Sequence, residues 1–183
     1  MKKVIALALS VVMVLSLVAC GGEPAAPAKF KVGMGHNISA KMTDATADKA
    51  GSAQVDTTML VAAFDAEGKV TSVSIDVAQQ KLGVNADGTT ADAAKADIRT
   101  KIEKEGDYGM AGVSGIGKEY FEQVKALGEW MVGKTVAEVT AMETFERDPS
   151  HTAVPAVEDL KASVTITVGA YLEALAEAET NAK

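Results

Sequence analysis

Residues 54–77, QVDTTMLVAAFDAEGKVTSVSIDV, decide the fold. The first part, 54–64, is rich in residues that favour β-strands, and 70–77 alternates apolar and polar residues with a period of two. Between them, DAEGK at 65–69 has the acidic residues and the glycine that are typical of a turn. The stretch therefore predicts an antiparallel β-hairpin.

On the N-terminal side, FKVGMG at 30–35 predicts a short additional strand. The polar, alanine-rich stretch 36–52 has no clear apolar period, and we expect it to form a loop. On the C-terminal side, NADG at 85–88 predicts a further turn.

Helical patterns follow the hairpin. The strongest is 118–132, where apolar residues recur at spacings of three and four and define one face of an amphipathic helix: Tyr120, Phe121, Val124, Leu127 and Met131. A charged helix is expected at 92–105, with Ile98 and Ile102 four residues apart. Thr135 and Glu138 have the spacing of a capping box, which predicts a short helix to about Met142.

The C-terminal part is less uniform. Residues 157–160 suit one turn of helix, and 169–178 favours a helix with Tyr171, Leu172 and Leu175 directed inward. The segment SVTITV at 163–168 suits either a strand or the start of a helix. About 150 residues follow position 30, which is enough for one domain. The expected fold class is α+β, an antiparallel sheet packed against helices in a single domain spanning 30–183.

The first twenty residues have the order of a lipoprotein signal peptide. Lys2 and Lys3 precede an apolar run from 4 to 17, and the small Ala19 precedes Cys20. The run is shorter than the roughly 20 apolar residues of a spanning helix. We expect cleavage of 1–19 and lipid on Cys20, which would place the protein on the extracytoplasmic face of a membrane. An uncleaved N-terminal anchor, with a cysteine there by chance, is the alternative.

Residues 20–29 predict a flexible linker, because they contain two prolines and few side chains able to build a core. Cys20 is the only cysteine, so no internal disulfide can form. Removal of Lys2 and Lys3 would change the net charge from -7 to -9. This acidity argues against nucleic acid as a partner.

The stretch GVSGIGKE at 112–119 has the glycine and lysine spacing of a phosphate-binding loop, but Glu119 stands where a nucleotide-triphosphate loop needs Ser or Thr. ATP binding is therefore not expected. Backbone near Ser114, Gly115 and Gly117 could still approach a single phosphate. The alternative is a glycine turn that joins two elements, with Ser114 capping the helix.

Other chemistry-bearing residues give no clear constellation. His36 and His151 are far apart and have no second metal ligand at helical or hairpin spacing, so solvated or locally bonded histidines are expected and no metal is predicted. Trp130 suits the core, and Tyr108, Tyr120 and Trp130 could also form the apolar walls of a flavin pocket.

Several short stretches of the mature chain share a pattern with one known family: 53–57, 65–70, 74–79, 107–110, 114–120, 133–139 and 163–166. On these stretches, which cover most of the mature chain, it resembles small extracytoplasmic domains that bind flavin mononucleotide (FMN). The resemblance is greatest to lipid-anchored flavoproteins that serve extracellular electron transfer in Gram-positive bacteria.

The resemblance implies FMN outside the cell, in many members joined through its phosphate to a threonine by a flavin transferase. The acceptor signature ends in Ser-Gly-Ala-Thr, whereas Ser114-Gly115 is followed here by Ile116-Gly117, which offers no acceptor hydroxyl. A reduced form of the signature occurs in the loop before the hairpin, where Asp44 precedes Thr46. Thr46 is the candidate acceptor, and a chance Asp-Ala-Thr in a polar loop is the alternative.

Taken together, the resemblance implies a membrane-anchored electron carrier that receives electrons from a membrane donor and has no substrate turnover of its own. A surface binding or scaffolding lipoprotein that has lost its flavin is the other function class that the sequence leaves open.

Overall fold

The computed structural model describes residues 30–90 and 97–183, and it forms one α+β domain in which a three-stranded antiparallel sheet packs against helices. This confirms the expected fold class. The expectations for the signal peptide, Cys20 and the linker lie outside the described residues. Within these residues, no helix is long and apolar enough to cross a membrane.

The sheet has the strand order β1-β2-β3, with β1 at Lys31–Thr43, β2 at Gly51–Phe64 and β3 at Val70–Val84. The hairpin of β2 and β3 is confirmed, and a bulge opposite Phe64 adjusts the register next to its turn. The loop expected at 36–52 is wrong in extent, because β1 continues through thirteen residues that pair with β2 up to Thr43, and only 44–50 connect the two strands. Its polar residues are tolerated because they lie on an exposed part of the strand.

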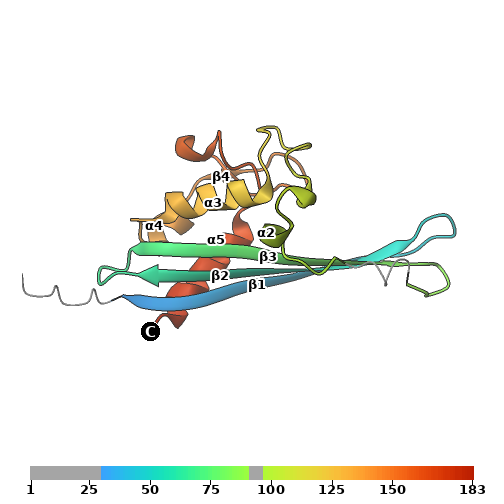
Figure 1. Ribbon diagram of the computed structural model, residues 1–183, viewed down its shortest axis with the longest axis horizontal. Helices are drawn as coiled ribbons and strands as arrows, with labels where there is room; N and C mark the ends of the chain where they lie inside the picture. Colours follow the sequence, from blue (N-terminus) through green and yellow to red (C-terminus); the bar gives the residue numbers. More distant parts are fainter. Residues whose placement is uncertain (1–29, 91–96) are drawn as a thin grey trace, which may run out of the picture.

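The three strands extend well past the helices as a long arm (Figure 1). The turn between β1 and β2 and the turn after β3 lie together at the tip of this arm. At the other end, the turn between β2 and β3 lies near the N-terminal end of β1.

The helices pack on one face of the sheet. They are α2 at Lys101–Lys104, α3 at Tyr120–Met131, α4 at Val136–Thr140 and α5 at Gly169–Asn181, with 3-10 turns η2 at Glu105–Tyr108 and η3 at Glu158–Leu160. The capping box of Thr135 and Glu138 forms as expected. The charged helix expected at 92–105 is wrong in extent, because only α2 is helical: 91–96 lie outside the described residues, 97–100 are not helical, and Ile98 is 78% exposed.

The segment 163–168 forms neither a strand nor a helix. It is an irregular connection whose alternate residues Val164, Ile166 and Val168 are buried, which explains its strand-like pattern. A two-stranded ribbon of β4 at Thr144–Phe145 and β5 at Val154–Pro155 was not expected from the sequence.

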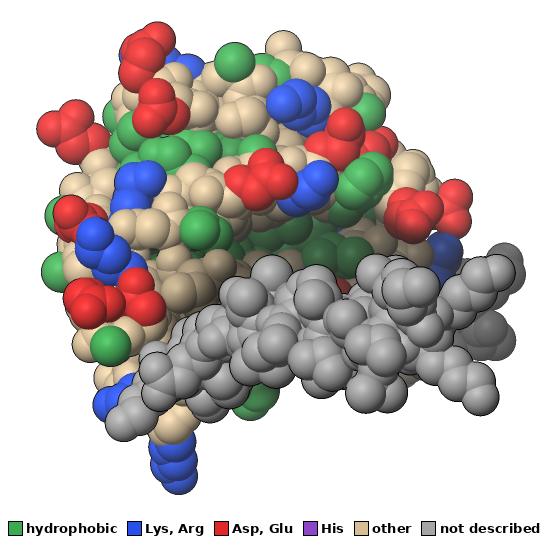
Figure 2. All heavy atoms as spheres, turned by 60° about the vertical axis from the view of Figure 1, so that its left-hand side comes forward, with side chains coloured by type: hydrophobic (Ala, Val, Ile, Leu, Met, Phe, Trp, Pro, Cys, Tyr) green, Lys and Arg blue, Asp and Glu red, His purple; other side chains and the backbone are tan. Residues whose placement is uncertain are grey.

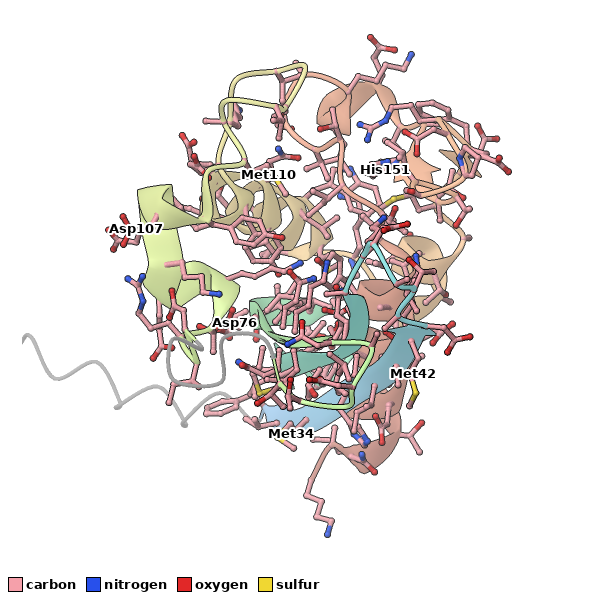
Figure 3. The ribbon with its side chains drawn as sticks, turned by 90° about the vertical axis from the view of Figure 1, so that its right-hand side faces the viewer. Met34, Met42, Asp76, Asp107, Met110 and His151 are labelled. Carbon is pink, nitrogen blue, oxygen red and sulfur yellow. The ribbon has the colours of Figure 1, made fainter. Side chains whose placement is uncertain are left out.

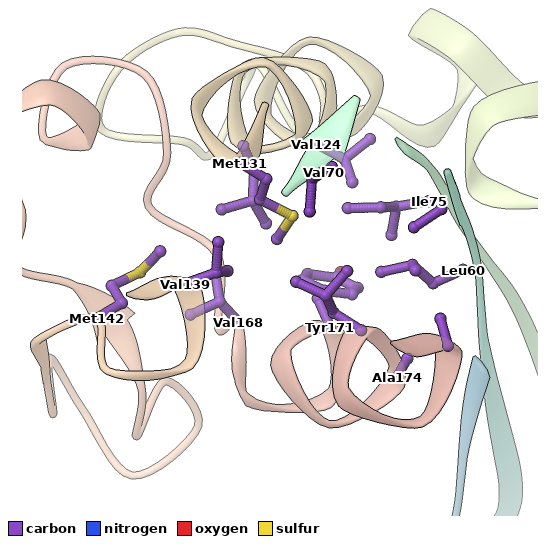
Figure 4. Packing of buried hydrophobic residues seen from close by; sticks show 14 of the residues in the cluster. Leu60, Val70, Ile75, Val124, Met131, Val139, Met142, Val168, Tyr171 and Ala174 are labelled. Carbon is purple, nitrogen blue, oxygen red and sulfur yellow. The ribbon is translucent and has the colours of Figure 1, made fainter. Parts of the chain in front are cut away.

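The core lies between the sheet and the helices α3, α4 and α5 (Figure 4). The inward face of α3 is buried as expected at Tyr120, Val124, Leu127 and Met131. In α5, Tyr171 and Leu175 are buried and Leu172 is partly buried.

Close contact between α5 and β1 depends on glycine. A Cβ atom at Gly33 or Gly35 would overlap the backbone carbonyl oxygen of Ala178 or Ala174. Glycine thus allows the C-terminal helix to lie directly against the first strand.

Candidate functional site

A concave site lies between β3 and α3, and we call it the β3–α3 groove. Its volume is about 500 Å³. Its apolar walls include Val73 and Ile75 from β3, Ile102 from α2, and Phe121 and Val124 from α3. Figure 1 shows α3 running along β3, with α2 near one end. A partly open, mainly apolar cleft of this size suits a small organic ligand.

One wall of the groove is a free strand edge. β3 is the last strand of its sheet, and its outer edge is covered at Val70 by backbone hydrogen bonds with Gly133 and Lys134. Across 71–75, no other described segment forms a backbone hydrogen bond with this edge. The groove therefore combines apolar side chains with backbone donors and acceptors that the sheet leaves unpaired.

Gly128 sets the width of the groove. A Cβ atom at this position in α3 would lie 3.2 Å from Cγ1 of Val73 and 3.8 Å from its carbonyl oxygen. Glycine lets α3 approach β3 closely. An isolated glycine inside an amphipathic helix is the one sequence signal that could have located this contact.

Asp76 holds the end of the groove. Its Oδ1 accepts hydrogen bonds from the backbone N–H groups of Ile102 at 3.2 Å and Val77 at 2.7 Å. Asp76 thereby ties the start of α2 to the edge of β3, and it places Ile102 in the groove wall. Figure 3 shows Asp76 between the sheet and the segment that carries Asp107.

Charged groups lie at the outer rim. Lys125 and Glu129 form an ion pair at 3.7 Å, and both side chains are largely exposed. A second recess of about 380 Å³ is lined by Lys118 and shares Phe121, Lys125 and Glu129 with the groove. Two lysines therefore flank Phe121 where the recesses meet. Figure 2 shows basic and acidic side chains interspersed with apolar ones over the helical layer.

The predicted residues Ser114, Gly115 and Gly117 lie in the loop that leads to Lys118. The hydroxyl of Ser114 accepts hydrogen bonds from Ile116 N–H at 3.4 Å and from Nε2 of Gln123 at 3.2 Å. Gly117 needs glycine because its φ is 64°, whereas Gly115 lies outside the left-handed region and a Cβ atom there would meet nothing within 4 Å. The fold itself does not require glycine at 115.

The first turn of α3 already has a carboxylate partner. Glu119 is its N-cap and forms a capping box with Glu122, so Ser114 is not the cap. The carboxylate oxygens of Glu119 also accept hydrogen bonds from the N–H groups of Met110 at 2.8 Å and Ala111 at 3.0 Å. A phosphate near this loop would therefore depend on the exposed backbone around Gly115 and on Lys118.

Asp44 and Thr46 lie elsewhere, at the tip of the arm. Thr46 pairs with Lys49 across a tight turn, with its N–H donating to the Lys49 carbonyl at 2.8 Å, and it is exposed. The adjoining recess of about 450 Å³ is also lined by Asn85 and Asp87. Figure 1 shows this tip far from α3. The structure does not bring the five predicted cofactor residues together.

The protein's three tyrosines form one cluster. The rings of Tyr108 and Tyr120 meet edge to face at 5.8 Å, and the Tyr171 hydroxyl donates to the Tyr120 hydroxyl at 3.3 Å. Nζ of Lys101 lies 5.1 Å from the Tyr108 ring centre and 5.2 Å from that of Tyr120. Burial raises the pKa of Tyr171 to about 12, and it also raises the pKa of Tyr120.

The expected flavin walls are therefore divided. Tyr120 is 1% exposed and belongs to the core, whereas Tyr108 is partly buried beside it. Trp130 is near the other end of α3, partly buried against the core, with Nζ of Lys134 4.3 Å from its ring centre. None of the three lines the β3–α3 groove.

The histidines are bonded to carboxylates. His151 contacts Asp148 at 2.8 Å within a turn, and His36 contacts Glu177 at 3.1 Å. The described part of the chain contains no group of three or more His, Cys, Asp or Glu placed to hold a metal ion.

Comparison with known proteins gives one distant similarity. Neither a protein-family model nor a solved structure matches the chain. A stretch of 125 residues is 30% identical to chlorophenol reductase from Desulfitobacterium hafniense, covering 62% of this chain and 38% of that protein. The chain thus spans less than half of the relative, which is by its name a redox protein.

Proposed function

We propose that this protein is a lipid-anchored extracytoplasmic flavoprotein that carries electrons through FMN, with the flavin ring in the β3–α3 groove. The observation that supports it most directly is the groove itself, in which apolar walls face a free strand edge. A flavin ring is flat and apolar on its faces, and its pyrimidine edge carries hydrogen-bonding nitrogen and oxygen atoms. The distant similarity to a reductase supports a redox role.

The residues present fit the parts of FMN. Phe121, Val73 and Ile102, which are only partly buried, offer apolar surface to a ring, and the backbone of 71–75 offers donors and acceptors. Lys118 and Lys125 offer positive charge to a phosphate at the adjoining rim, where Glu122 and Glu129 also line the recess, so a phosphate would replace Glu129 as the partner of Lys125. Bound FMN would supply the redox chemistry, and the protein would hold it and shield one side.

The lipid anchor on Cys20 would hold the protein at the membrane surface. Phe30 is ten positions after Cys20, so an extended linker reaches at most about 35 Å. Lipid on Cys20 would hold the domain close to a membrane-bound electron donor. FMN held in the groove would not be linked to Thr46, because the arm tip lies far from α3 (Figure 1). Covalent attachment by a flavin transferase is the alternative placement of the flavin, with Thr46 as acceptor because this residue is exposed in a turn at the arm tip.

Titration with FMN tests the binding site. The full-length protein is freed of flavin, and quenching of flavin fluorescence measures the dissociation constant. We expect Lys125→Glu to weaken binding about tenfold, because one attractive charge becomes repulsive. Lys161→Glu is the matched control, since Lys161 is an exposed lysine paired with Glu158 outside the groove. Equal affinities for the two variants would place the flavin elsewhere.

A surface binding or scaffolding lipoprotein without flavin is the second candidate. The observation in its favour is Gly117, which stands where the covalent acceptor threonine would be expected in the Ser114 loop. A colourless purified protein that neither binds added FMN nor accepts it from a flavin transferase would support this function and exclude electron transfer through FMN.

A further inference from the structure

The side of the sheet opposite the helices is apolar. Gly33 and Gly35 of β1 contact α5, so the alternate residues Val32, Met34 and Ile38 point to the other side. The register places Val55, Met59 and Val61 of β2 beside them. We call these six residues the outer face.

The outer face is open among the described residues. Met34 is 58% exposed and Ile38 is 61% exposed, and the three valines each exceed 40%. Figure 3 shows Met34 on the side of the sheet away from the loops of Met110 and His151. Contiguous apolar surface of this kind marks an interaction site more often than a free surface.

The charge pattern indicates what kind of partner fits. The outward register positions of the three strands contain no Lys, Arg or Glu, and the one outward aspartate, Asp76, is bonded to the N–H groups of Val77 and Ile102. The charged residues Lys41, Asp56 and Lys81 alternate onto the opposite side. His36, which also has an outward register position, is paired with Glu177 of its own chain at 3.1 Å. A face without lysine or arginine does not suit anionic lipid, whereas a second copy of the same mainly apolar face can cover it while Asp76 and His36 keep the partners they already have.

The area is sufficient for a dimer. The rows from Val32 to Ala40 repeat about every 6.7 Å along the strand, and three strands lie about 4.8 Å apart. The outer face, together with the outward positions of β3 beside it, therefore has a flat footprint of roughly 500 Å² per copy, or about 1,000 Å² in total, which is near the lower limit for a specific interface. Exposed side chains such as Met34 and Ile38 increase the surface that is buried.

Assembly through the edge of β1 is blocked by α5. Glu177 accepts the backbone N–H of His36 at 2.7 Å, and Asn181 donates to the carbonyl of Met34 at 3.0 Å. These side chains occupy backbone groups that another strand would need. Contact between copies through β1 is therefore face to face rather than edge to edge.

We propose that two copies of this chain pair through the outer face, sheet against sheet, to form a symmetric dimer. Twisted sheets pack in this way with their strands about 30° apart and their layers about 10 Å apart. The symmetry is isologous, so Met34 and Ile38 of both copies are buried together. This inference does not depend on flavin binding.

Sedimentation equilibrium of the full-length protein in density-matched detergent tests the proposal. We expect wild type to have the mass of two chains, and Ile38→Lys to raise the dimer dissociation constant at least tenfold because each dimer would bury two new charges. Ile98→Lys is the matched control, since Ile98 is 78% exposed and lies outside the outer face. Val61→Lys provides a second interface variant, and circular dichroism checks that each variant is folded.

The salt dependence of dimerisation is an independent test. Because each chain carries a net charge of -7, added salt should screen repulsion between copies and strengthen the dimer. A monomeric wild type, or a folded Ile38→Lys that dimerises as well as Ile98→Lys, would overturn the proposal. Monomers that adhere to uncharged lipid vesicles through Ile38 would identify a lipid partner instead.

Discussion

The side-chain oxygen of Gln123 accepts two hydrogen bonds from Thr165, from its backbone N–H at 2.9 Å and from its hydroxyl at 3.2 Å. The side-chain nitrogen of Gln123 donates to the carbonyl of Lys118 at 3.1 Å and to the Ser114 hydroxyl at 3.2 Å. Gln123 is completely buried. One amide therefore joins the loop before α3 to the segment before α5.

We expect Gln123→Leu to lower the free energy of unfolding by about 2–4 kcal/mol, because it leaves the buried polar groups of Thr165 without a partner. Urea unfolding measures the change. Gln79→Leu, a partly exposed position on the arm, should change stability by less than about 1 kcal/mol. Equal effects of the two substitutions would contradict the role assigned to Gln123.

Glycine at 35 is required by packing, whereas glycine at 115 is not. Gly35→Ala should destabilise the domain by about 3 kcal/mol or more, because the new Cβ overlaps the backbone of α5 at Ala174. Gly115→Ala should leave stability nearly unchanged, since its Cβ meets open space. Thermal unfolding of the two variants distinguishes them, and a well-folded, fully stable Gly35→Ala would disprove the close approach of α5 to β1.

The tyrosine cluster predicts a loss of stability at alkaline pH. The pKa of Tyr171 is about 12 in the fold, above its ordinary value near 10, because burial disfavours the ionised form. The resulting stabilisation is complete below about pH 10 and decreases as the pH rises towards 12. Unfolding measured from pH 8 to 12 should show this decrease, and Tyr171→Phe should reduce it. An unchanged pH profile in that variant would assign the decrease to other groups.

Thr46 is expected to be the acceptor if a flavin transferase modifies the protein. Incubation with the transferase, magnesium and flavin adenine dinucleotide should add one FMN to wild type, as measured by intact mass. Thr46→Ala should abolish the adduct, because the turn positions no other hydroxyl where Thr46 now stands. Thr89→Ala, in the neighbouring turn, is the control. An adduct that persists without Thr46 would move the attachment site.

The hairpin and the helix α3 were predictable because their patterns are local. The alternation of apolar and polar residues in 70–77 predicts which face of the strand is buried. The spacing of three and four between apolar residues from Tyr120 to Met131 does the same for the helix. The extension of β1 was not predictable, since strand pairing satisfies its backbone irrespective of its polar side chains. Burial of Val164, Ile166 and Val168 gave a strand pattern without a strand because core contacts replace sheet pairing there.

Most of the candidate groove could not be predicted from the sequence. It combines the edge of β3 with a helix some fifty residues later, and no local pattern in Val73 or Phe121 reports that contact. Gly128 was the only local hint. The resemblance directed attention to Ser114, Gly115 and Gly117, which lie in the loop before Lys118 at the rim, and to Thr46 at the distant tip.

Contact between β1 and α5 has a consequence for biosynthesis. The first strand is completed by hydrogen bonds and packing from Glu173, Glu177 and Ala178, about 140 residues later in the chain. The ribosome must therefore finish α5 before the domain can close, and contacts so distant in sequence form slowly. A nascent chain with this arrangement cannot complete its sheet layer until α5 has been synthesised.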